Sequence, residues 1–283
     1  MEYYIIIPAH NEAEFLAGTL DSVVAQSLPP KKVIVVNDHS TDDTEGIIDG
    51  YVKKHPFIQK RNRHSSEQHM PGSKVIQTFN YGLELLDDAY DFLVKLDADI
   101  ILPPDYFKHI ARIFQENPQV GIAGGFAYEK DTKGEWKRNH PMNNDHVRGA
   151  FKSYSKSCFK AIGGLKAAMG WDTVDELLAL FHGFAIYTDE TLRVKHLRPI
   201  GAAYNKRAKF LQGEAMYALR YGLGITIIAS LKMALKSKKL PAFIDNLRGY
   251  LSARKNKKPY IVSEEEGRFI RKHRWQGIRK KLF

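Results

Sequence analysis

Cysteine is nearly absent from this chain. Cys158 is the single cysteine among 283 residues, so the sequence can form neither an internal disulfide nor a cysteine-rich zinc site. We expect it to be a small core residue, and redox chemistry is not indicated. No Gly-x-Gly-x-x-Gly follows the first apolar run, which argues against an oxidoreductase that uses a dinucleotide.

Long hydrophobic runs and targeting features are missing as well. An uncharged run at residues 221–231 is too short to span a bilayer. The chain opens with Met1-Glu2-Tyr3 and passes directly into Ile5-Ile6-Ile7, without the basic start and long apolar core of a signal peptide. We therefore expect a cytoplasmic protein. We find no internal repeat and no low-complexity segment.

Acidic residues are scarce in the last third of the chain. Residues 195–283 contain 22 Lys and Arg but 5 Asp and Glu, a formal charge of +17, whereas residues 1–194 carry −6 of the total of +11. An acidic body suits a divalent cation, and a basic tail suits phosphate-bearing surfaces such as anionic lipid or nucleic acid. The two parts are thus expected to meet different partners.

Apolar strand-like runs alternate with helical patterns through the first half. The predicted strands are 3–7, 33–36, 92–96 and 120–123, and the predicted helices are 14–26, 43–55, 74–86 and 106–116. This alternation predicts an α/β fold with a mostly parallel sheet flanked by helices. A polar stretch within 125–144 predicts a surface loop or hairpin, and the chain after Tyr187 is expected to be helical and basic.

Polar residues stand where three predicted strands end. Asp97 and Asp99 can point the same way because strand side chains alternate, and two close carboxylates favour a shared Mg²⁺ or Mn²⁺. Asp38 ends the second strand and can accept a hydrogen bond from a base or ribose, although a helix cap is the alternative. The first strand runs into Ile7-Pro8-Ala9-His10-Asn11-Glu12. Since ligands bind at the carboxyl ends of parallel strands, the three ends together indicate one site.

These segments together resemble the family 2 inverting glycosyltransferases of the GT-A fold. Ile7 to Glu12, then Val36-Asn37-Asp38-His39-Ser40-Thr41-Asp42, then Asp97-Ala98-Asp99 agree with that family in order and spacing, over about residues 3–200. The resemblance implies a GT-A, Rossmann-like nucleotide-diphospho-sugar transferase domain at 1–200, with a nucleotide-binding half (1–100) and an acceptor-binding half (101–200). Residues 201–283 would form a basic helical C-terminal extension.

The resemblance also implies roles for single residues. Lys74 begins a helix after Gly72-Ser73 and could hold a phosphate, with an exposed lysine as the alternative. An isolated histidine such as His196 is alternatively structural. Asn37 stands where relatives usually carry Asp, which leaves the donor base open. The implied donor-binding residues are Pro8, Ala9, Glu12, Asp38, Lys74 and Asp97, and the implied metal ligands are Asp99, Asp97 and His196.

An inverting transfer needs a general base that removes the proton of the acceptor hydroxyl. The family supplies it from a Thr-Glu-Asp-type motif. The resemblance aligns Thr173 with the motif threonine and Asp175 with the base, while Val174 replaces the usual Glu. Asp172 is the alternative, because Asp172 or Thr173 could cap the helix and either carboxylate could be catalytic. Regions that shape acceptor pockets in relatives correspond to Trp136, Arg138, His140, Arg148 and the turn Gly149-Ala150.

The expected reaction is an inverting, metal-assisted transfer from a UDP-, GDP- or dTDP-sugar to a saccharide or lipid-linked acceptor. Bacterial cell-surface polysaccharide or glycolipid synthesis is the expected setting. The chain lacks the Gln-x-x-Arg-Trp pattern and the long spanning runs of processive synthases, which favours a single addition. A catalytically inactive scaffold is an alternative, given Val174.

The tail has two interpretations. Apolar Leu223, Ile227, Ile228 and Leu231 followed by lysines predict an interfacial helix at an anionic membrane surface, so that the protein would be peripheral at the inner face of the plasma membrane. The alternative is a helix packed on the protein's own core. A nucleic-acid-binding module also suits a basic tail, but it leaves the acidic strand ends unexplained, and we expect no nucleic acid partner.

Overall fold

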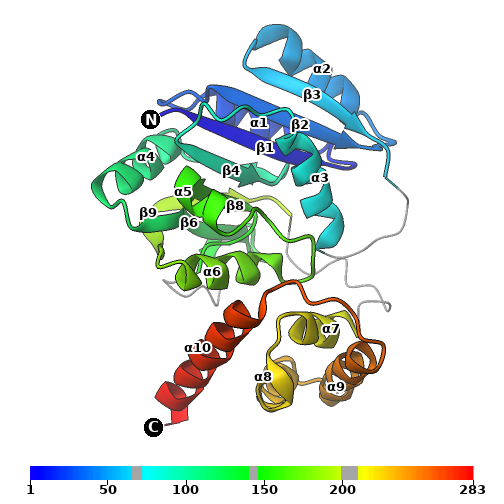
Figure 1. Ribbon diagram of the computed structural model, residues 1–283. Helices are drawn as coiled ribbons and strands as arrows, with labels where there is room; N and C mark the ends of the chain where they lie inside the picture. Colours follow the sequence, from blue (N-terminus) through cyan, green and yellow to red (C-terminus); the bar gives the residue numbers. More distant parts are fainter. Residues whose placement is uncertain (66–71, 140–145, 199–209, 283) are drawn as a thin grey trace.

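The computed structural model describes residues 1–65, 72–139, 146–198 and 210–282. Figure 1 shows a sheet with surrounding helices and, beyond it, a helical C-terminal region. The predicted boundary between residues 200 and 201 lies outside the described residues. No helix within the described ranges is both long enough and apolar enough to cross a membrane.

Within the described residues, nine strands form one sheet in the order β3-β2-β1-β4-β8-β6-β9-β5, with β7 paired to β6. The half made of β3, β2, β1 and β4 is entirely parallel. The other half is mixed, because β8 runs antiparallel to β4 and β6 while β9 runs parallel to β6. The strands are β1 (Tyr3–Ala9), β2 (Lys32–Asp38), β3 (Ile58–Arg63), β4 (Phe92–Leu96), β5 (Ile100–Ile101), β6 (Val120–Lys130), β7 (Trp136–Arg138), β8 (Phe151–Ser155) and β9 (Ala185–His196).

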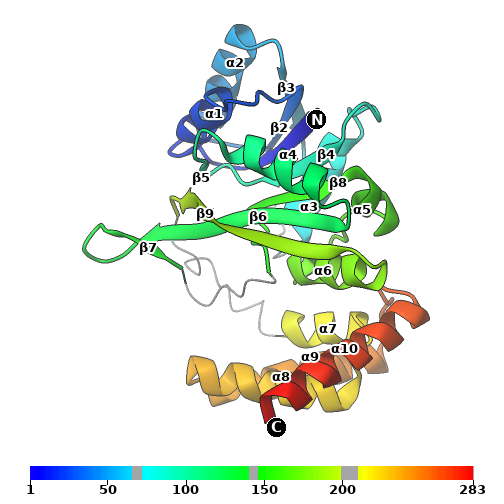
Figure 2. The same ribbon diagram turned by 90° about the vertical axis from the view of Figure 1, so that its left-hand side faces the viewer.

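Helices cover both faces of the sheet. α1 and α2 contact each other on one face, whereas α3 packs on β1 and β2 from the other. This arrangement confirms the predicted α/β fold with flanking helices and a helical C-terminal region (Figures 1 and 2). The helices are α1 (Leu16–Val24), α2 (Thr44–Lys54), α3 (Ser73–Leu83), α4 (Tyr106–Glu116), α5 (Lys156–Ala161), α6 (Trp171–Phe181), α7 (Leu211–Ala218), α8 (Gly222–Ser237), α9 (Leu240–Lys255) and α10 (Glu264–Leu282).

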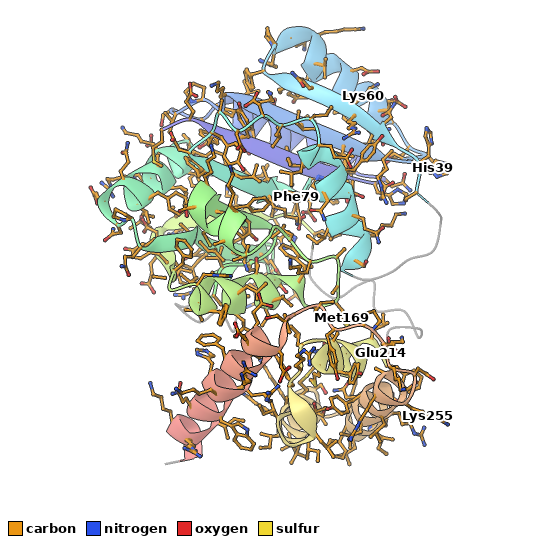
Figure 3. All side chains as sticks on the ribbon, viewed as in Figure 1. His39, Lys60, Phe79, Met169, Glu214 and Lys255 are labelled. Carbon is orange, nitrogen blue, oxygen red and sulfur yellow. The ribbon has the colours of Figure 1, made fainter. Side chains whose placement is uncertain are left out.

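The core lies between the parallel strands and their helices. Every residue of β1 is buried, and the β2 and β4 side chains beside it are buried too. Gly82 lets α3 approach the sheet closely, because a Cβ at this position would lie 2.8 Å from methyl groups of both Ile6 and Val36. Figure 3 shows Phe79 of the same helix inside the molecule and His39 at the end of β2. The tightly packed strands therefore hold the loops after β1, β2 and β4 in fixed positions.

One expectation from the sequence needs correction. The chain after Tyr187 is not helical at once, since β9 continues to His196 and pairs with β6 over most of its length. At the start of α4, the Asp105 carboxylate accepts a hydrogen bond from the Ser27 hydroxyl at 2.6 Å. The polar stretch after Gly125 forms a hairpin of β6 and β7 in its described part, up to residue 139.

The C-terminal helices pack on one another and on α6. Close backbone contact joins α7 to α9, where a Cβ at Gly213 would lie 1.8 Å from the Asn246 carbonyl oxygen. At the other junction, Phe269 of α10 meets Phe181 of α6 with ring centroids 5.6 Å apart. In both views α8 and α9 lie further from the sheet than α7 (Figures 1 and 2).

Candidate active site

A cavity of about 1030 Å³ opens where the parallel strands end. This volume is at the upper end of the range typical of small-molecule sites. Its walls come from the loops after β1, β2 and β4, from the start of α3, from the segment before β8 and from the start of α6. Of the residues singled out in the sequence, the lining includes Pro8, Ala9, Glu12, Asp38, Lys74, Asp97, Asp99, Asp172 and His196.

The loops after β1 and β2 are tied together by side chains. Asn11 accepts a hydrogen bond from the Thr41 N–H at 2.7 Å, and Ser40 accepts one from the Asn11 N–H at 3.0 Å. Asn11 and His39 both adopt positive φ angles, 54° and 57°. Such conformations cost energy and persist where surrounding contacts enforce them, often at functional sites. The loops therefore form a rigid wall of the cavity.

The two carboxylate oxygens of Asp38 differ in their hydrogen bonds. Its Oδ2 accepts hydrogen bonds from Arg63 at 3.0 Å and from the Thr78 hydroxyl at 2.9 Å. Its Oδ1 is buried and has no hydrogen-bond partner among the residues that the structure describes. A buried carboxylate oxygen without a donor is costly, so an N–H or O–H group of a ligand in the cavity would satisfy it. Asn37, in contrast, bonds to Asn62 and to the Ser40 N–H and has a structural role.

Lys74 lies in the first turn of α3, beside Gly72. Gly72 has φ +74°, and a Cβ there would come within 3.0 Å of the Ala168 carbonyl oxygen. The glycine therefore allows the segment before α6 to approach the start of α3. Backbone N–H groups at a helix start attract anions, and the lysine adds a positive charge on the same cavity wall.

Asp99 and His196 face each other at the end of β4. Asp99 Oδ2 and His196 Nε2 are 3.4 Å apart, and His196 Nδ1 lies 3.4 Å from Glu129. Burial lowers the pKa of His196, but the hydrogen bond and charge of Asp99 outweigh it, so the pKa is raised. Burial likewise raises the pKa of Asp99, and the His196 contacts reverse this and lower it.

Asp97 points to a different partner. Its carboxylate accepts a hydrogen bond from Lys95, a buried lysine whose ammonium also lies 5.1 Å from the Trp171 ring centroid. Accordingly, no group of three or more His, Cys, Asp or Glu side chains within the described ranges is arranged to hold a metal ion. The carboxylate of Asp99 and the imidazole of His196 still form a donor pair of the kind that divalent cations accept.

Glu12 closes the cavity on the β1 side. Its Oε2 accepts a hydrogen bond from Arg198 at 2.6 Å. Burial raises the pKa of Glu12 to about 7, although Arg198 acts in the opposite direction. This pair connects the loop after β1 to the segment after β9, across 186 residues of sequence.

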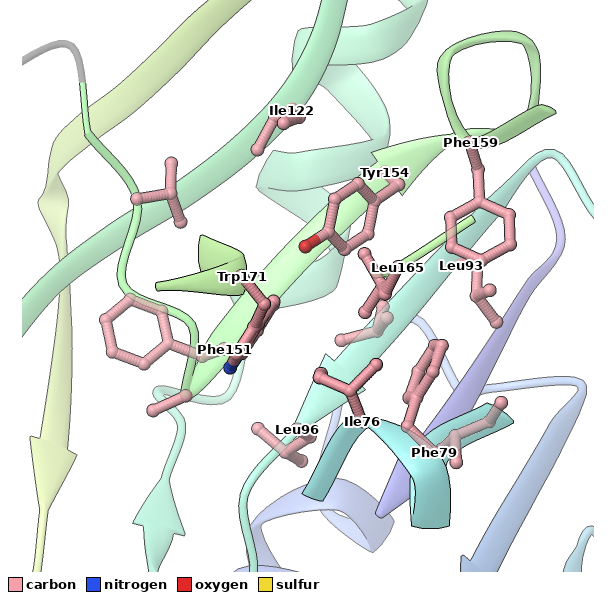
Figure 4. Packing of buried hydrophobic residues seen from close by; sticks show 14 of the residues in the cluster. Ile76, Phe79, Leu93, Leu96, Ile122, Phe151, Tyr154, Phe159, Leu165 and Trp171 are labelled. Carbon is pink, nitrogen blue, oxygen red and sulfur yellow. The ribbon is translucent and has the colours of Figure 1, made fainter. Parts of the chain in front are cut away.

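Asp172 and Asp175 lie on α6 in very different surroundings. Asp172 is half-buried and lines the cavity. Asp175 is 2% exposed and is not among the cavity-lining residues of the described chain. Its carboxylate is held by Lys152 at 2.9 and 3.0 Å and by the Tyr154 hydroxyl at 2.5 Å. Figure 4 shows Tyr154 among the buried side chains near Trp171, the first residue of α6.

A buried ionic cluster therefore lies behind Asp172. Lys152 is fully buried and contacts Asp175 and also Glu176, at 2.9 Å. One cation beside two carboxylates keeps its proton, so the pKa of Lys152 is raised despite its burial. Burial raises the pKa of Asp175 more than Lys152 lowers it. Lys152 also donates to the Asp172 carbonyl oxygen at 2.5 Å, which fixes the first turn of α6.

His146 was not anticipated from the sequence. It lines the cavity, and its Nδ1 lies 2.8 Å from Glu176 Oε2. The hydrogen bond with Glu176 raises the pKa of His146, partly offset by burial. Its contact with Glu176 joins residues 30 positions apart, so no local pattern could reveal it.

The residues that were expected to shape the acceptor pocket differ in where they lie. Arg148, Gly149 and Ala150 line the cavity. Trp136 and Arg138 belong to β7 and are not among its lining residues in the described chain, and His140 lies outside the described residues. A Cβ at Gly149 would lie 2.6 Å from the Trp171 ring. Glycine at this position therefore keeps the indole against the cavity wall.

Comparison with known proteins identifies the family. The profile described as Glycosyl transferase family 2 matches residues 4–169, more than half of the chain. The chain belongs to glycosyl transferase family 2. This membership confirms the family expected from the strand-end motifs, and it makes the protein a glycosyltransferase.

Sequence relatives within the family match only part of the chain. A poly-beta-1,6-N-acetyl-D-glucosamine synthase of Staphylococcus epidermidis is 28% identical over 123 residues, covering 42% of this chain and 27% of the synthase. An uncharacterized glycosyltransferase of Mycoplasma genitalium is 25% identical over 175 residues, covering 58% of this chain and 56% of the relative. The chain thus spans about a quarter of the length of the synthase that it matches.

Solved structures agree in fold. Residues 1–349 of S. aureus TarS in complex with UDP-GlcNAc align with a TM-score of 0.59 and 18% identity, covering 94% of this chain and 77% of that one. The mannosyltransferase PcManGT from Pyrobaculum calidifontis, in complex with GDP-Man and Mn²⁺, aligns with a TM-score of 0.57 and 15% identity, covering 100% and 81%. At these identities the likeness establishes the GT-A fold alone.

Proposed function

We propose that this glycosyltransferase is an inverting enzyme that moves a sugar from a nucleoside-diphosphate donor to an acceptor hydroxyl with the help of a divalent cation. The observation that carries the proposal is that one cavity is lined by the start of α3, by the Asp99 and His196 pair, by Asp172 and by Asp38, whose buried Oδ1 has no partner in the described part of the chain. These groups suit the phosphates of a donor, a divalent cation, the reacting hydroxyl of an acceptor and the nucleobase of the donor, in that order.

The donor would lie along the ends of β1, β2 and β4. Asp38 Oδ1 would accept a hydrogen bond from an N–H group of the nucleobase, since Oδ2 already accepts hydrogen bonds from Arg63 and Thr78. Pro8, Ala9 and Glu12 would line the nucleoside, and Asp97 would face the ribose. Lys74 and the N–H groups of the first turn of α3 would hold phosphate oxygens by charge and hydrogen bonding.

Asp99 and His196 would hold Mg²⁺ or Mn²⁺, with Asp97 close by. Their donor atoms fit such an ion, because one carboxylate oxygen and one imidazole nitrogen face each other in a nearly buried position. When bound, a divalent cation neutralises the charge that develops on a leaving diphosphate. The mannosyltransferase of similar fold was solved with GDP-Man and Mn²⁺, which supports the proposal without deciding the ion.

Asp172 is the residue that we assign as general base. Its carboxylate would take the proton of the acceptor hydroxyl as that oxygen bonds to the anomeric carbon and the bond from this carbon to the diphosphate oxygen breaks. Asp175, the residue that the motif alignment favours, is occupied by Lys152 and Tyr154. The Val174 departure from the family motif therefore gives no reason to infer an inactive scaffold, because Asp172 supplies the carboxylate.

A thermal-shift and transfer panel tests the proposal. UDP-GlcNAc, GDP-Man and a dTDP-sugar would be added with Mn²⁺, with Mg²⁺ or with chelator, to wild type, Asp38→Asn and Asp99→Ala. A donor at 100 times its Kd adds about 2.7 kcal/mol of stability. We expect one nucleotide class to stabilise the wild type in a metal-dependent way and neither variant to respond normally. If no donor stabilises the protein under any condition and none is hydrolysed, the proposed function is wrong.

The setting that we propose is the assembly of a bacterial cell-surface polysaccharide or glycolipid, on a saccharide or lipid-linked acceptor. The named relatives that support it are the poly-beta-1,6-N-acetyl-D-glucosamine synthases of staphylococci. Offering the purified enzyme a panel of lipid-linked and free saccharides tests this part. Transfer to a nucleic acid or protein acceptor instead would contradict it.

A further inference from the structure

Exposed apolar side chains are concentrated in the C-terminal helices. Twelve of the fifteen large hydrophobic side chains that are exposed in the described residues lie between residues 210 and 282. Exposed hydrophobic residues scattered singly over a surface are normal, whereas a contiguous group marks an interaction site. The concentration of exposed apolar side chains in the C-terminal helices indicates an interaction surface there.

α8 has apolar residues on two faces. One face packs inward, and Ser230 on that face contacts Met216 of α7. The other carries an apolar stripe, which we define as Leu223, Ile227, Leu231 and Leu235, at intervals of four residues. Residues spaced in this way lie on the same side of a helix. All four are exposed, and Leu235 reaches 64%.

α9 and α10 extend this surface. Leu240, Ile244 and Leu251 are exposed on α9, on the side away from the residues that pack on α7. Trp275 of α10 is 39% exposed and adjoins α8, since a Cβ at Gly224 would lie 3.4 Å from its ring. Tryptophan is enriched where a protein meets the boundary between water and lipid.

Basic residues lie beside the C-terminal half of the stripe. Residues 210–282 contain 17 Lys and Arg but 5 Asp and Glu. Lys232 and Lys236 are exposed on α8 directly beside the stripe, and Lys238 and Lys239 follow in the turn to α9. Figure 3 shows that Lys255, near the end of α9, projects outward from this region. The surface thus combines an apolar centre with a positive border.

We propose that this surface of α8, α9 and Trp275 docks on an anionic lipid leaflet, with the apolar stripe in the acyl boundary and the lysines at the headgroups. A second copy of the chain would bring the same positive border against itself, which like-charge repulsion opposes. A nucleic acid would satisfy the lysines but would leave Leu231 and Leu235 in water. A lipid surface satisfies both sets. The inference does not depend on the proposed function.

Vesicle flotation of the full chain tests the proposal. We expect binding to phosphatidylcholine vesicles that contain phosphatidylglycerol, weak binding to phosphatidylcholine alone, and loss of binding as salt rises. Replacing Lys232, Lys236 and Lys239 by Gln should lower the partition coefficient about 100-fold, roughly fivefold per lysine. Replacing Ile227, Leu231 and Leu235 by Ser should abolish flotation.

Control variants carry changes of the same kind on the sheet domain. Leu85→Ser removes a side chain that is 42% exposed on the sheet domain, and Gln at Lys53, Lys54 and Lys108 removes three exposed charges there. These variants should float nearly as well as the wild type. Light scattering without lipid should report a monomer. Equal flotation of all variants, or no flotation of the wild type, would overturn the proposal. A dimer that the serine substitutions dissociate would also overturn it, because a second copy would then cover the stripe.

Discussion

The contrast between Asp172 and Asp175 yields the sharpest prediction. Asp172→Asn keeps the size of a half-buried side chain on the cavity wall but removes its ability to take a proton. A general base contributes about 10²- to 10⁴-fold to rate, so kcat for transfer should fall by that factor. Because the Asp172 carboxylate forms no ion pair with any of the described residues, the free energy of unfolding should change by less than about 0.5 kcal/mol.

Asp175→Asn should have the opposite profile. The change leaves the fully buried Lys152 with Glu176 as its remaining carboxylate. Removing one partner of a buried ion pair costs about 3–5 kcal/mol. For a chain of this size each kcal/mol lowers Tm by about 2–4 °C, so a decrease of roughly 10 °C is expected. Well below that Tm, transfer should fall by less than about tenfold, since Asp172 is still present.

A surface ion pair supplies the control. Asp88 and Lys160 are 2.5 Å apart but 70% and 53% exposed, so Asp88→Asn should leave Tm nearly unchanged. Thermal unfolding and donor-saturated transfer rates would be measured on all three variants. The reasoning fails if Asp172→Asn keeps wild-type kcat. It also fails if Asp175→Asn loses transfer completely while its Tm is unchanged, which would make Asp175 the base.

Three further predictions follow from single contacts. Glu176 raises the pKa of His146, so the stability that this contact adds is complete below the unfolded pKa near 6.5 and is lost as pH rises through the folded value. The Tm advantage of wild type over His146→Gln should therefore shrink as pH rises above about 6.5. Gly82→Ala should lower the unfolding free energy by about 1–3 kcal/mol through overpacking, while Gly50→Ala in α2, with open space around it, should raise it by about 0.5–1 kcal/mol; chemical denaturation measures both. Asp99→Ala should remove any effect of chelator on donor-induced thermal shift, and a persistent chelator effect would place the ion elsewhere.

Three strands of the parallel half, β1, β2 and β4, could be predicted because they are buried on both faces. Runs such as Tyr3 to Ile7 have no polar face, and this is a strong sequence signal. β3 lies at the sheet edge and alternates little, since only Ile58 of its six residues is buried. β9 carries four charged residues over its length, and its part after Tyr187 was expected to be helical. Pairing with neighbouring strands, rather than composition, determines both elements.

The cavity could be anticipated only in part. Strand-end motifs are local, so Asp38, Asp97 and Asp99 were recognisable from their positions after apolar runs. The charge partners of a site are set by tertiary contacts. Lys152 lies on β8 and contacts Asp175 on α6, 23 residues away. The local sequence of neither residue predicts this contact. This contact is the reason why we propose Asp172, and not Asp175, as the general base.

The helix α6 also joins the two parts of the protein. Asp172 lies in the first turn of α6, and Phe181 at its other end packs on Phe269 of α10. An 11-residue helix is about 16 Å long. The cavity wall at Asp172 and the contact with Phe269 of α10 are therefore held at a fixed distance by one rigid element. If α8, α9 and Trp275 rest on a lipid surface, α6 transmits that attachment directly to the catalytic cavity. Loosening the junction with Phe269→Ala should therefore leave vesicle binding intact, because the stripe is untouched, while making transfer at a vesicle-borne acceptor fall relative to transfer at a soluble one. An equal effect on both acceptors would show that the attachment and the catalytic cavity act independently.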